Sequence, residues 1–519
     1  MISFQLPSSL QIAAAITTIL IIRILHKYFV RPYFLLQHFK KYKEGLCIYR
    51  PIIGTMREIK TNFSAHGDAA YDIKRRIKEN PSLRFVASPL LDTVFVTIYD
   101  PNLIKQFLNK ETMVTVKYLA LTKGTMSEFS KHSLVFTEGE KWKRLRKLIS
   151  QVFHFEYMNS SLPTIRATAQ EWIARNCKSS ESPCIVNVSK EFKMYTSTTL
   201  WRIFFGENNF TEDDKAAETV GLLLGNVKRG RDLNMSVLSF IFGSSFFKLG
   251  LRSIDREFMR DQKIINKIFY SKLNHLKEKQ KLKSTEHQGG NFGESTKFKN
   301  LIELLLEQSE GLSNPEIVAQ ISTFFLAGTD TTSELLAISH YLLATYPEAQ
   351  NKLREEVLTH IGKTEEVTYD HISKMEYLNA VIKEAFRFGG PSMGVIPRIV
   401  TQNFMLNEIE IKKGTVINVS STGVAYNPQL FSNPEDFRPE RWIEKVEPGT
   451  IDTSTHLPFS AGGRRCIGEQ LALIESKVML CELVRRFKIE LKLPYKLTMG
   501  IGIVYHAEPP VHAIYTPIA

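Results

Sequence analysis

One short stretch, residues 459–468, constrains this 519-residue chain more than any other. It reads FSAGGRRCIG and places one cysteine, Cys466, in a glycine-punctuated loop directly after two arginines. Glycine adopts backbone conformations that a Cβ forbids, and it lets another group approach the chain closely. The run Gln470–Val484 has a helical pattern, so Cys466 precedes a helix N-terminus. We expect the arginines and that N-terminus to lower the pKa of Cys466 and favour its thiolate.

A thiolate on a rigid loop is a good axial ligand for haem iron. The alternative is a lone buried cysteine after a turn, which is the commoner fate of a cysteine. The stretch fits the spacing F-x-x-G-x-R-x-C-x-G without a gap. It resembles the haem-binding loop of the cytochrome P450 superfamily, in its membrane-anchored, microsomal type. The resemblance implies haem b (iron protoporphyrin IX), with Cys466 as the iron ligand and Phe459, Arg464 and Gly468 as haem contacts.

A basic segment earlier in the chain carries a second motif of this family. Trp142 and Arg146 lie four residues apart in GEKWKRLRK, so both project from one face of a helix. They resemble the W-x-x-x-R helix, which implies that both bind haem propionates, with Arg398 and Arg464 as further propionate ligands. The alternative is an ordinary amphipathic basic helix. Its remaining cations form either a docking surface for an acidic redox partner or a solvated face.

The longest helical pattern runs from Asn314 to Tyr346, about 45–50 Å at 1.5 Å per residue. It contains AGTDTT at 327–332, which resembles the oxygen-activation motif of the family. The hydroxyl of Thr331 can bond the carbonyl of Ala327 one turn earlier and bend the helix. The resemblance implies that Ala327 lies beside haem and that Asp330 and Thr331 are catalytic proton carriers. A helix-packing glycine with back-bonded threonines is the alternative, and both interpretations can hold together.

Two further motifs indicate a structural network. Glu384 and Arg387 lie three apart on a predicted helix, and Arg441 lies in FRPERW further on. They resemble the E-x-x-R and P-E-R-F/W motifs of the family, in the family's order. The resemblance implies that these three residues form a buried ion network that supports the fold behind the haem.

The N-terminus predicts a membrane helix. No charged side chain occurs from Met1 to Ile22, and residues 10–22 are mostly aliphatic, slightly short of the ~20 residues of a bilayer crossing. Basic residues follow, which orients the rest of the chain towards the cytosol. A cleaved signal peptide is the alternative, but the basic region that begins such a peptide is missing. We expect an anchor with a basic flank over residues 1–31, a catalytic domain over 32–519, and a single-pass protein of the endoplasmic reticulum.

Charge and cysteine content narrow the partners and the compartment. The formal net charge is +13, which suits an anionic membrane surface or an acidic protein. No zinc-finger spacing or RNA-binding signature accompanies it, so nucleic acid ranks last. The five cysteines are odd in number and lack C-x-x-C spacing, which argues against a disulfide framework or a structural zinc site. A reducing compartment fits best.

The remaining pattern is mainly α with small β-sheets, and the resemblance implies one cytochrome P450 fold preceded by a membrane helix. We expect a helix over Ala65–Glu79 and an exposed loop over Lys277–Asn300. The aromatic segment Ser239–Leu251 is either core or a membrane contact. The expected strands are Thr93–Ile98, Ile396–Thr401, Phe404–Glu410 and Thr415–Val419.

The predicted function is a haem-thiolate monooxygenase that inserts one oxygen atom from O2 into a lipophilic small molecule. By resemblance, the pocket walls are mostly apolar: Tyr118–Phe129, Phe324–Thr332, Ser392–Ile396 and Gly500–Val504. Electrons would come from NADPH through a flavoprotein reductase, with cytochrome b5 as a second candidate donor. Two alternatives stay open, an isomerase or peroxide-using enzyme that needs no reductase and a non-catalytic membrane haem-binding protein.

Overall fold

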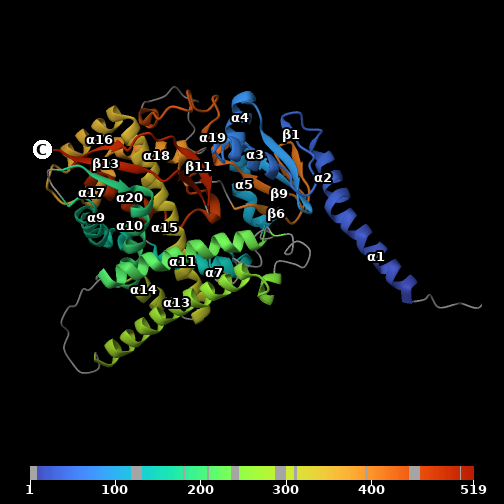
Figure 1. The fold of residues 1–519 in the computed structure, drawn as a ribbon, viewed down its shortest axis with the longest axis horizontal. Coiled ribbons are helices and arrows are strands. Elements are labelled where there is room, and N and C mark those ends of the chain that lie inside the picture. Colours follow the sequence, from blue (N-terminus) through green and yellow to red (C-terminus); the bar gives the residue numbers. More distant parts are fainter. Residues whose placement is uncertain are drawn as a thin grey trace, which may run out of the picture. The chain divides into compact units, whose positions relative to one another are not determined.

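The computed structural model describes residues 9–118, 131–153, 155–178, 182–206, 210–234, 236, 245–286, 300–308, 312–391, 396–443, 456–502 and 504–518. The chain forms two compact units that are interleaved along the sequence. Unit 1 comprises Met1–Tyr118, Gly394–Asn433 and Ile451–Leu457. Unit 2 comprises Leu119–Met393, Pro434–Thr450 and Pro458–Ala519. Both contain more helix than strand, so the prediction of a mainly α fold with small sheets is confirmed (Figure 1).

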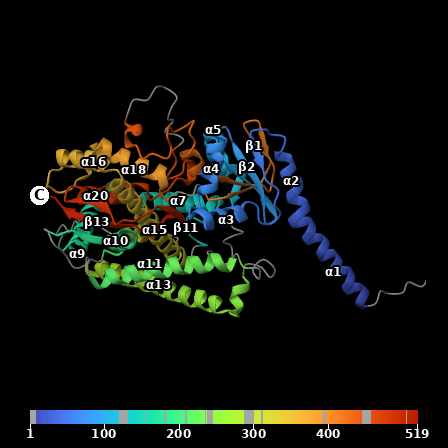
Figure 2. The same cartoon turned by 45° about the horizontal axis from the view of Figure 1, so that its top comes forward.

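Unit 1 begins with a long helical run made of α1 (Ser9–Leu25), a π-helical turn (His26–Val30) and α2 (Arg31–Phe39). The described side chains of α1 are exposed, and α1 projects away from the rest of its unit in Figures 1 and 2. By length and composition, Ala13–Phe39 could cross a membrane. α2 differs from α1, because its side chains Pro32, Leu36 and Phe39 are buried and it packs against β2 (Phe85–Leu90) and β3 (Thr93–Ile98). The boundary between exposed and packed helix therefore falls at the π-helical turn.

The centre of unit 1 is a six-stranded mixed sheet in the order β1-β2-β3-β9-β6-β4. β2 and β3 pair antiparallel, and β9 adds to β3 in parallel. A separate hairpin pairs β7 with β8. The predicted strand at Thr93–Ile98 is confirmed, whereas the expected strand at Phe404–Glu410 is divided between β7 and β8. The other strands of this unit are β1 (Gly45–Cys47), β4 (Thr115–Lys117), β6 (Arg398–Val400), β7 (Phe404–Leu406), β8 (Ile409–Ile411) and β9 (Val416–Val419).

The helix expected over Ala65–Glu79 is two helices. α3 (Met56–His66) ends at Gly67, which has a φ of 69°, a left-handed conformation that favours glycine and stops the helix. α4 (Tyr71–Glu79) then begins after a short turn. The remaining helices of unit 1 are α5 (Pro101–Val114) and α19 (Ser421–Ala425).

Unit 2 is built around α15 (Asn314–Thr345), which is buried along most of its length and packs against α10, α13, α18 and α20 (Figure 1). Its predicted extent is confirmed to within one residue. Ser313 and Glu316 form a capping box at its N-terminus, which satisfies backbone N–H groups there. The other helices are α7 (Gly139–Val152), α8 (Phe155–Ser160), α9 (Leu162–Asn176), α10 (Val188–Phe205), α11 (Phe210–Asn234), α13 (Ser253–Glu286), α14 (Leu301–Gln308), α16 (Pro347–His360), α17 (Tyr369–Lys374), α18 (Glu376–Gly389) and α20 (Glu469–Val484).

Two small sheets complete unit 2. One has the order β10-β13-β5 and the other pairs β11 with β12, all antiparallel. The strands are β5 (Cys184–Asn187), β10 (Phe487–Leu491), β11 (Thr498–Ile501), β12 (Tyr505–Glu508) and β13 (His512–Pro517).

Unit 2 bears on three expectations from the sequence. The loop expected from Lys277 is wrong in its first part, because α13 continues to Glu286. The cysteine count argued against a disulfide framework, yet Cys177, just after α9, and Cys184, at the start of β5, are bonded, with their Cα atoms 5.6 Å apart. Much of Ser239–Leu251 lies outside the described residues. At its described end, Leu249 is exposed, as a membrane contact would require.

Candidate active site

The loop that carries Cys466 is closed by its own backbone. The Cys466 N–H donates to the carbonyl of Phe459 at 2.9 Å, and a short 3-10 turn spans Gly462–Arg464. Gly462 has a φ of 69°, which explains why glycine stands there. The Phe459 ring meets Phe386 of α18 edge to face, 5.0 Å between centroids. The loop is therefore fixed at both ends, and α20 begins directly after it.

The environment of Cys466 corrects the expectation of a lowered pKa. Desolvation raises the pKa of Cys466, and it outweighs the Gly468 N–H and the charges of Arg146 and Arg465, which act to lower it. The residue as a whole is nevertheless exposed, so the raised pKa comes from the atoms packed around its sulfur and not from a position in the core. A bound metal ion deprotonates a coordinating thiol outright, so the raised pKa is compatible with a ligand role.

Helix α7 presents two donors side by side. Trp142 and Arg146 are both half-buried and lie one turn apart. Within the described residues, neither the indole N–H nor the Arg146 guanidinium makes a hydrogen bond or an ion pair. Burial lowers the pKa of Arg146, and a charged Cys466 would raise it, so the two residues interact electrostatically. A half-buried cation with spare donors is suited to an anionic ligand.

The two other arginines predicted to bind propionates already have protein partners. Arg464 stacks on the Trp142 ring, 3.9 Å from its centroid, donates to the carbonyl of Thr137 at 3.0 Å and pairs with Glu138. Arg398 belongs to unit 1, where it forms a buried ion pair with Glu111 at 3.4 Å. The structure thus gathers every predicted site residue except Arg398 within unit 2.

The middle of α15 has an unusual pattern of exposure. Ala327 is exposed although Phe325, Thr329 and Asp330 around it are buried. The Thr331 hydroxyl donates to the Ala327 carbonyl at 2.8 Å, so the predicted back-bond is confirmed. An exposed alanine in a mostly buried helix means that α15 borders open space at this turn.

Gly328 has the packing role that was the alternative interpretation of this motif. A Cβ at Gly328 would lie 2.8 Å from Cδ1 of Leu200, a buried residue of α10. A side chain at this position would therefore force the end of the Leu200 side chain to shift, so the close contact between α10 and α15 favours glycine. The packing contact of Gly328 therefore lies on the same helical turn as Asp330 and Thr331, the predicted proton carriers.

Asp330 lies beside a lysine that the sequence did not reveal. The Nζ of Lys193, on α10, is 3.7 Å from Oδ1 of Asp330 and 3.5 Å from Oε1 of Glu334. Desolvation raises the pKa of Asp330, although Lys193 and His506 act against it. Glu334 could have been found from its spacing, since it follows Asp330 by one helical turn. Lys193 could not, because nothing in its own segment marks it.

The network around Glu384 is fully buried. Arg387 donates to both carboxylate oxygens, at 2.9 and 2.8 Å, and Arg441 donates to Oε1 at 3.0 Å. The Trp442 indole and the Arg438 backbone N–H also donate to this carboxylate. Desolvation acts to raise the pKa of Glu384, but hydrogen bonds and charge from the two arginines lower it overall. The carboxylate ties α18 to the 3-10 turn Pro439–Trp442.

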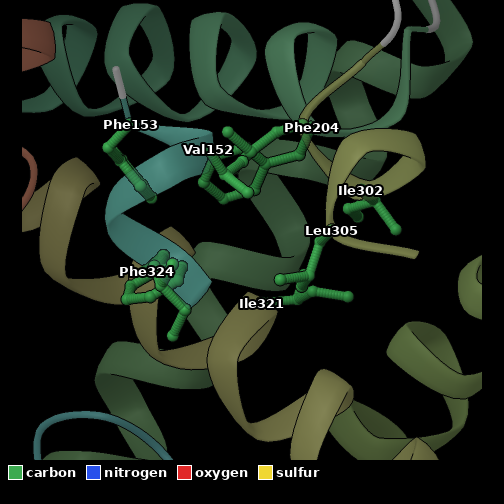
Figure 3. Close-up of a pocket in the computed structure, with 9 residues that line it drawn as sticks. Val152, Phe153, Phe204, Ile302, Leu305, Ile321 and Phe324 are labelled. Carbon is green, nitrogen blue, oxygen red and sulfur yellow. The ribbon is translucent and has the colours of Figure 1, made fainter. Parts of the chain in front are cut away.

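Of the expected pocket walls, only the start of one lines the cavity drawn in Figure 3. That cavity lies between α7, α10, α14 and α15, and the Phe153 and Phe324 rings approach edge to face at 5.4 Å. The walls expected at residues 119–129, 392–395 and 503 lie outside the described residues. The lining is entirely apolar: Ile149, Val152, Phe153, Phe204, Leu301, Ile302, Leu305, Ile321 and Phe324.

The residues of unit 2 fit a haem group. Cys466 is exposed, and a Cβ at Gly468 would meet no atom within 4 Å, which leaves room beside the loop. The donors of Trp142 and Arg146 match a carboxylate in type and number. An exposed cysteine in a fixed loop, beside a helix whose donors have no partner among the described residues, is the arrangement that the haem-thiolate class of protein requires.

Comparison with known proteins agrees with that class. The family model "Cytochrome P450" matches residues 81–511. Cytochrome P450 3A13 of Mus musculus is 30% identical over 78% of this chain and 79% of its own length. Cytochrome P450 3A9 of Rattus norvegicus is 29% identical over 78% and 79%, and cytochrome P450 4A10 of the same species is 25% identical over 76% of each chain. The chain belongs to the cytochrome P450 family and is a haem-dependent monooxygenase.

Proposed function

We propose that this cytochrome P450 inserts one oxygen atom from O2 into a lipophilic small molecule, using electrons from NADPH delivered by a flavoprotein reductase. Cytochrome b5 is a second candidate electron donor. When bound, haem b supplies the activation of dioxygen and the transfer of the oxygen atom. The protein supplies binding, orientation and electrostatics.

Each predicted site residue has a proposed role towards haem. Cys466 provides the axial thiolate, and Trp142 and Arg146 hold a propionate through an indole N–H and a guanidinium. Arg464 and Arg398 assist propionate binding. The contacts that border the ring are Phe459, Gly468 and Ala327.

Two residues of α15 manage protons. The Thr331 hydroxyl donates to the Ala327 carbonyl, and the ammonium of Lys193 lies close enough to Asp330 to stabilise the charge of its carboxylate. A positioned donor of this kind is what general acid chemistry needs. Asp330 would accept a proton from the solvent side and restore the proton of the Thr331 hydroxyl after that hydroxyl has given its own up. Glu384, Arg387 and Arg441 act structurally, because removing one partner leaves buried charge uncompensated.

The proposed cellular setting is a membrane. The exposed apolar helix α1 suits a single-pass anchor, with residues 32–519 as a cytosolic catalytic domain at the endoplasmic reticulum. Lipophilic substrates partition into lipid, so a membrane position would concentrate them. The exposed lysines of α7 would meet the acidic surface of the reductase.

The observation that carries this proposal is the exposed Cys466 in a loop fixed by the Phe459 carbonyl. The test is the carbon monoxide difference spectrum of the reduced, detergent-solubilised protein. The expected result is a Soret band at the long wavelength of thiolate ligation, lost in Cys466→Ser. Cys47→Ser, in unit 1, is the matched control and should retain it. A thiolate band in Cys466→Ser would contradict the assignment.

The alternative is a haem-thiolate isomerase or peroxide-using enzyme that needs no reductase. The presence of Asp330 and Thr331 in adjacent positions argues against it, since such enzymes can work without a proton relay. Oxygen consumption that depends on substrate, NADPH and reductase would support the monooxygenase. Product formation at full rate without reductase would support the alternative.

A further inference from the structure

A group of charged side chains joins Asp330 to solvent on the side of α15 that packs against α10. One ammonium, Lys193, lies next to two carboxyl groups, Asp330 and Glu334. Both carboxyl groups project from the same face of α15 because they are four residues apart. The backbone N–H of Ala507, on β12, donates to Oε2 of Glu334 at 3.2 Å and fixes this carboxyl in place.

The charges in this group do not balance unless one carboxyl is protonated. A single ammonium can neutralise one buried carboxylate, and burial disfavours the second. Desolvation raises the pKa of Glu334 to about 7 and also raises the pKa of Asp330, while Lys193 lowers both. Near neutral pH the group therefore holds one proton that can be given up and recovered.

Both carboxyl groups lie deeper than Lys193, and Glu334 is the most buried of the three side chains. The Lys193 side chain is 31% exposed, whereas Asp330 and Glu334 are 9% and 3% exposed. His506 and Glu508 of β12 form the outer edge, with an Nε2–Oε2 distance of 3.7 Å.

His506 and Tyr495 are further titratable neighbours of the two carboxyl groups. Desolvation and Lys193 lower the pKa of His506, so its ring is neutral at pH 7 and can both accept and donate a proton. Burial raises the pKa of Tyr495, and the charges of Tyr341 and Glu334 both act to raise it further. The Tyr495 hydroxyl therefore stays protonated and donates to the Pro509 carbonyl instead.

We propose that Glu334 supplies the proton that Asp330 passes on during turnover, with Lys193 holding the two carboxyl groups together. In each transfer the O–H bond of the Glu334 carboxyl breaks, and the proton ends on a carboxylate oxygen of Asp330. Glu334 then recovers a proton from solvent past Lys193 and His506. Glu334 is thus a positioning residue that acts through Asp330, and this inference rests on the proposed function.

The first test is the titration of the buried carboxyl by infrared difference spectroscopy on the full-length haem-loaded protein. The expected result is a protonated-carboxyl band that disappears with a midpoint near pH 7 and is absent in Glu334→Gln. Lys193→Met removes a cation that stabilises the carboxylate, so the midpoint should rise by about one pH unit or more. Lys190→Met, an exposed lysine on the same helix, should leave it unchanged. A midpoint near the ordinary value of a glutamate would overturn the proposal.

The second test measures where electrons from NADPH go when purified reductase is added without organic substrate. One NADPH and one proton reduce O2 to hydrogen peroxide, whereas two NADPH and two protons reduce it to two waters. The peroxide formed per NADPH should be low below pH 7 and rise above it, since Glu334 then lacks its proton. In Glu334→Gln the ratio should be at least about twofold higher at pH 6 and show no step near pH 7.

The outcomes separate this inference from the proposed function. Loss of the thiolate spectrum in the parent protein would defeat the proposed function, whereas the infrared titration would still report on the group. A normal spectrum with equal peroxide ratios in the parent and Glu334→Gln would defeat the inference alone. If Glu334→Gln does not fold, the same decision rests on Lys193→Met against Lys190→Met.

Discussion

At the scale of single residues, three proposed site residues are exposed or have no protein partner where packing or pairing is usual. Arg146 is half-buried without an ion-pair partner among the described residues, and Cys466 is accessible although desolvation raises the pKa of its thiol. Ala327 is exposed within a mostly buried helix. Buried polar groups are normally hydrogen-bonded, so the guanidinium of Arg146, with no such partner among the described residues, is suited to a ligand. We propose that these three positions border the haem.

The residue-scale prediction concerns Arg146. Arg146→Leu should weaken haem binding about tenfold to hundredfold, because a hydrogen bond to a charged group contributes about 1.5–3 kcal/mol. The measurement is the haem dissociation constant, from competition with apomyoglobin. Lys147→Leu, on the same helix but exposed, should change it little. Equal effects of both substitutions would remove the propionate role from Arg146.

At the scale of elements, α15 combines packing and chemistry along one turn. Gly328 admits Leu200 of α10, and the neighbouring Asp330 faces Lys193 of the same helix. Because α10 supplies both contacts, its distance from α15 sets the geometry of the acidic group. A change in helix packing should therefore reach the proton chemistry without touching a titratable residue.

The element-scale prediction tests that contact by a pair of substitutions. Gly328→Ala should destabilise the protein by about 1–3 kcal/mol through overpacking against Leu200. The thermal midpoint of helix loss, followed by circular dichroism, measures it. In a Leu200→Ala background the same change should be neutral or stabilising, because alanine favours helix by about 1 kcal/mol over glycine. Additive effects of the two substitutions would show that the residues do not compete for the same space.

At the scale of the whole molecule, the N-terminal helical run has two different environments. α1 is exposed, whereas α2 buries Leu36 and Phe39 in unit 1. Anchoring and folding are therefore assigned to consecutive parts of one helical run, separated by the π-helical turn His26–Val30. A deletion that ends at this turn should therefore change membrane association, and a deletion that also removes α2 should lower the free energy of unfolding.

The corresponding prediction compares two deletions. Removing residues 1–30 should release the protein from the membrane fraction with little change in thermal midpoint. Removing residues 1–39 should destabilise it further by about 3–6 kcal/mol, since two large apolar side chains are lost from the core. Retention of the shorter deletion in the membrane fraction would point to a second membrane contact, such as the exposed Leu249.

Much of the fold could be predicted from local pattern. The extent of α15 and the strand Thr93–Ile98 follow from apolar periodicity, and the spacing of Glu384 and Arg387 indicated their network. Features that depend on distant parts of the chain could not be predicted this way. The pKa of Cys466 depends on burial, and Lys193 meets Asp330 only because α10 packs on α15. Local sequence also gave no stop signal that would end α13 before Glu286.

The contact between Gly328 and Leu200 also limits how this chain can change over generations. A side chain at position 328 displaces the end of the Leu200 side chain unless position 200 has first become smaller, so the two substitutions have a preferred order. The reverse order passes through a destabilised intermediate sequence. Among relatives that keep this helix pair, a larger residue at the first position should accompany a smaller one at the second. A reconstruction of ancestral sequences should therefore place the replacement of Leu200 by a smaller residue on an earlier branch than the replacement of Gly328.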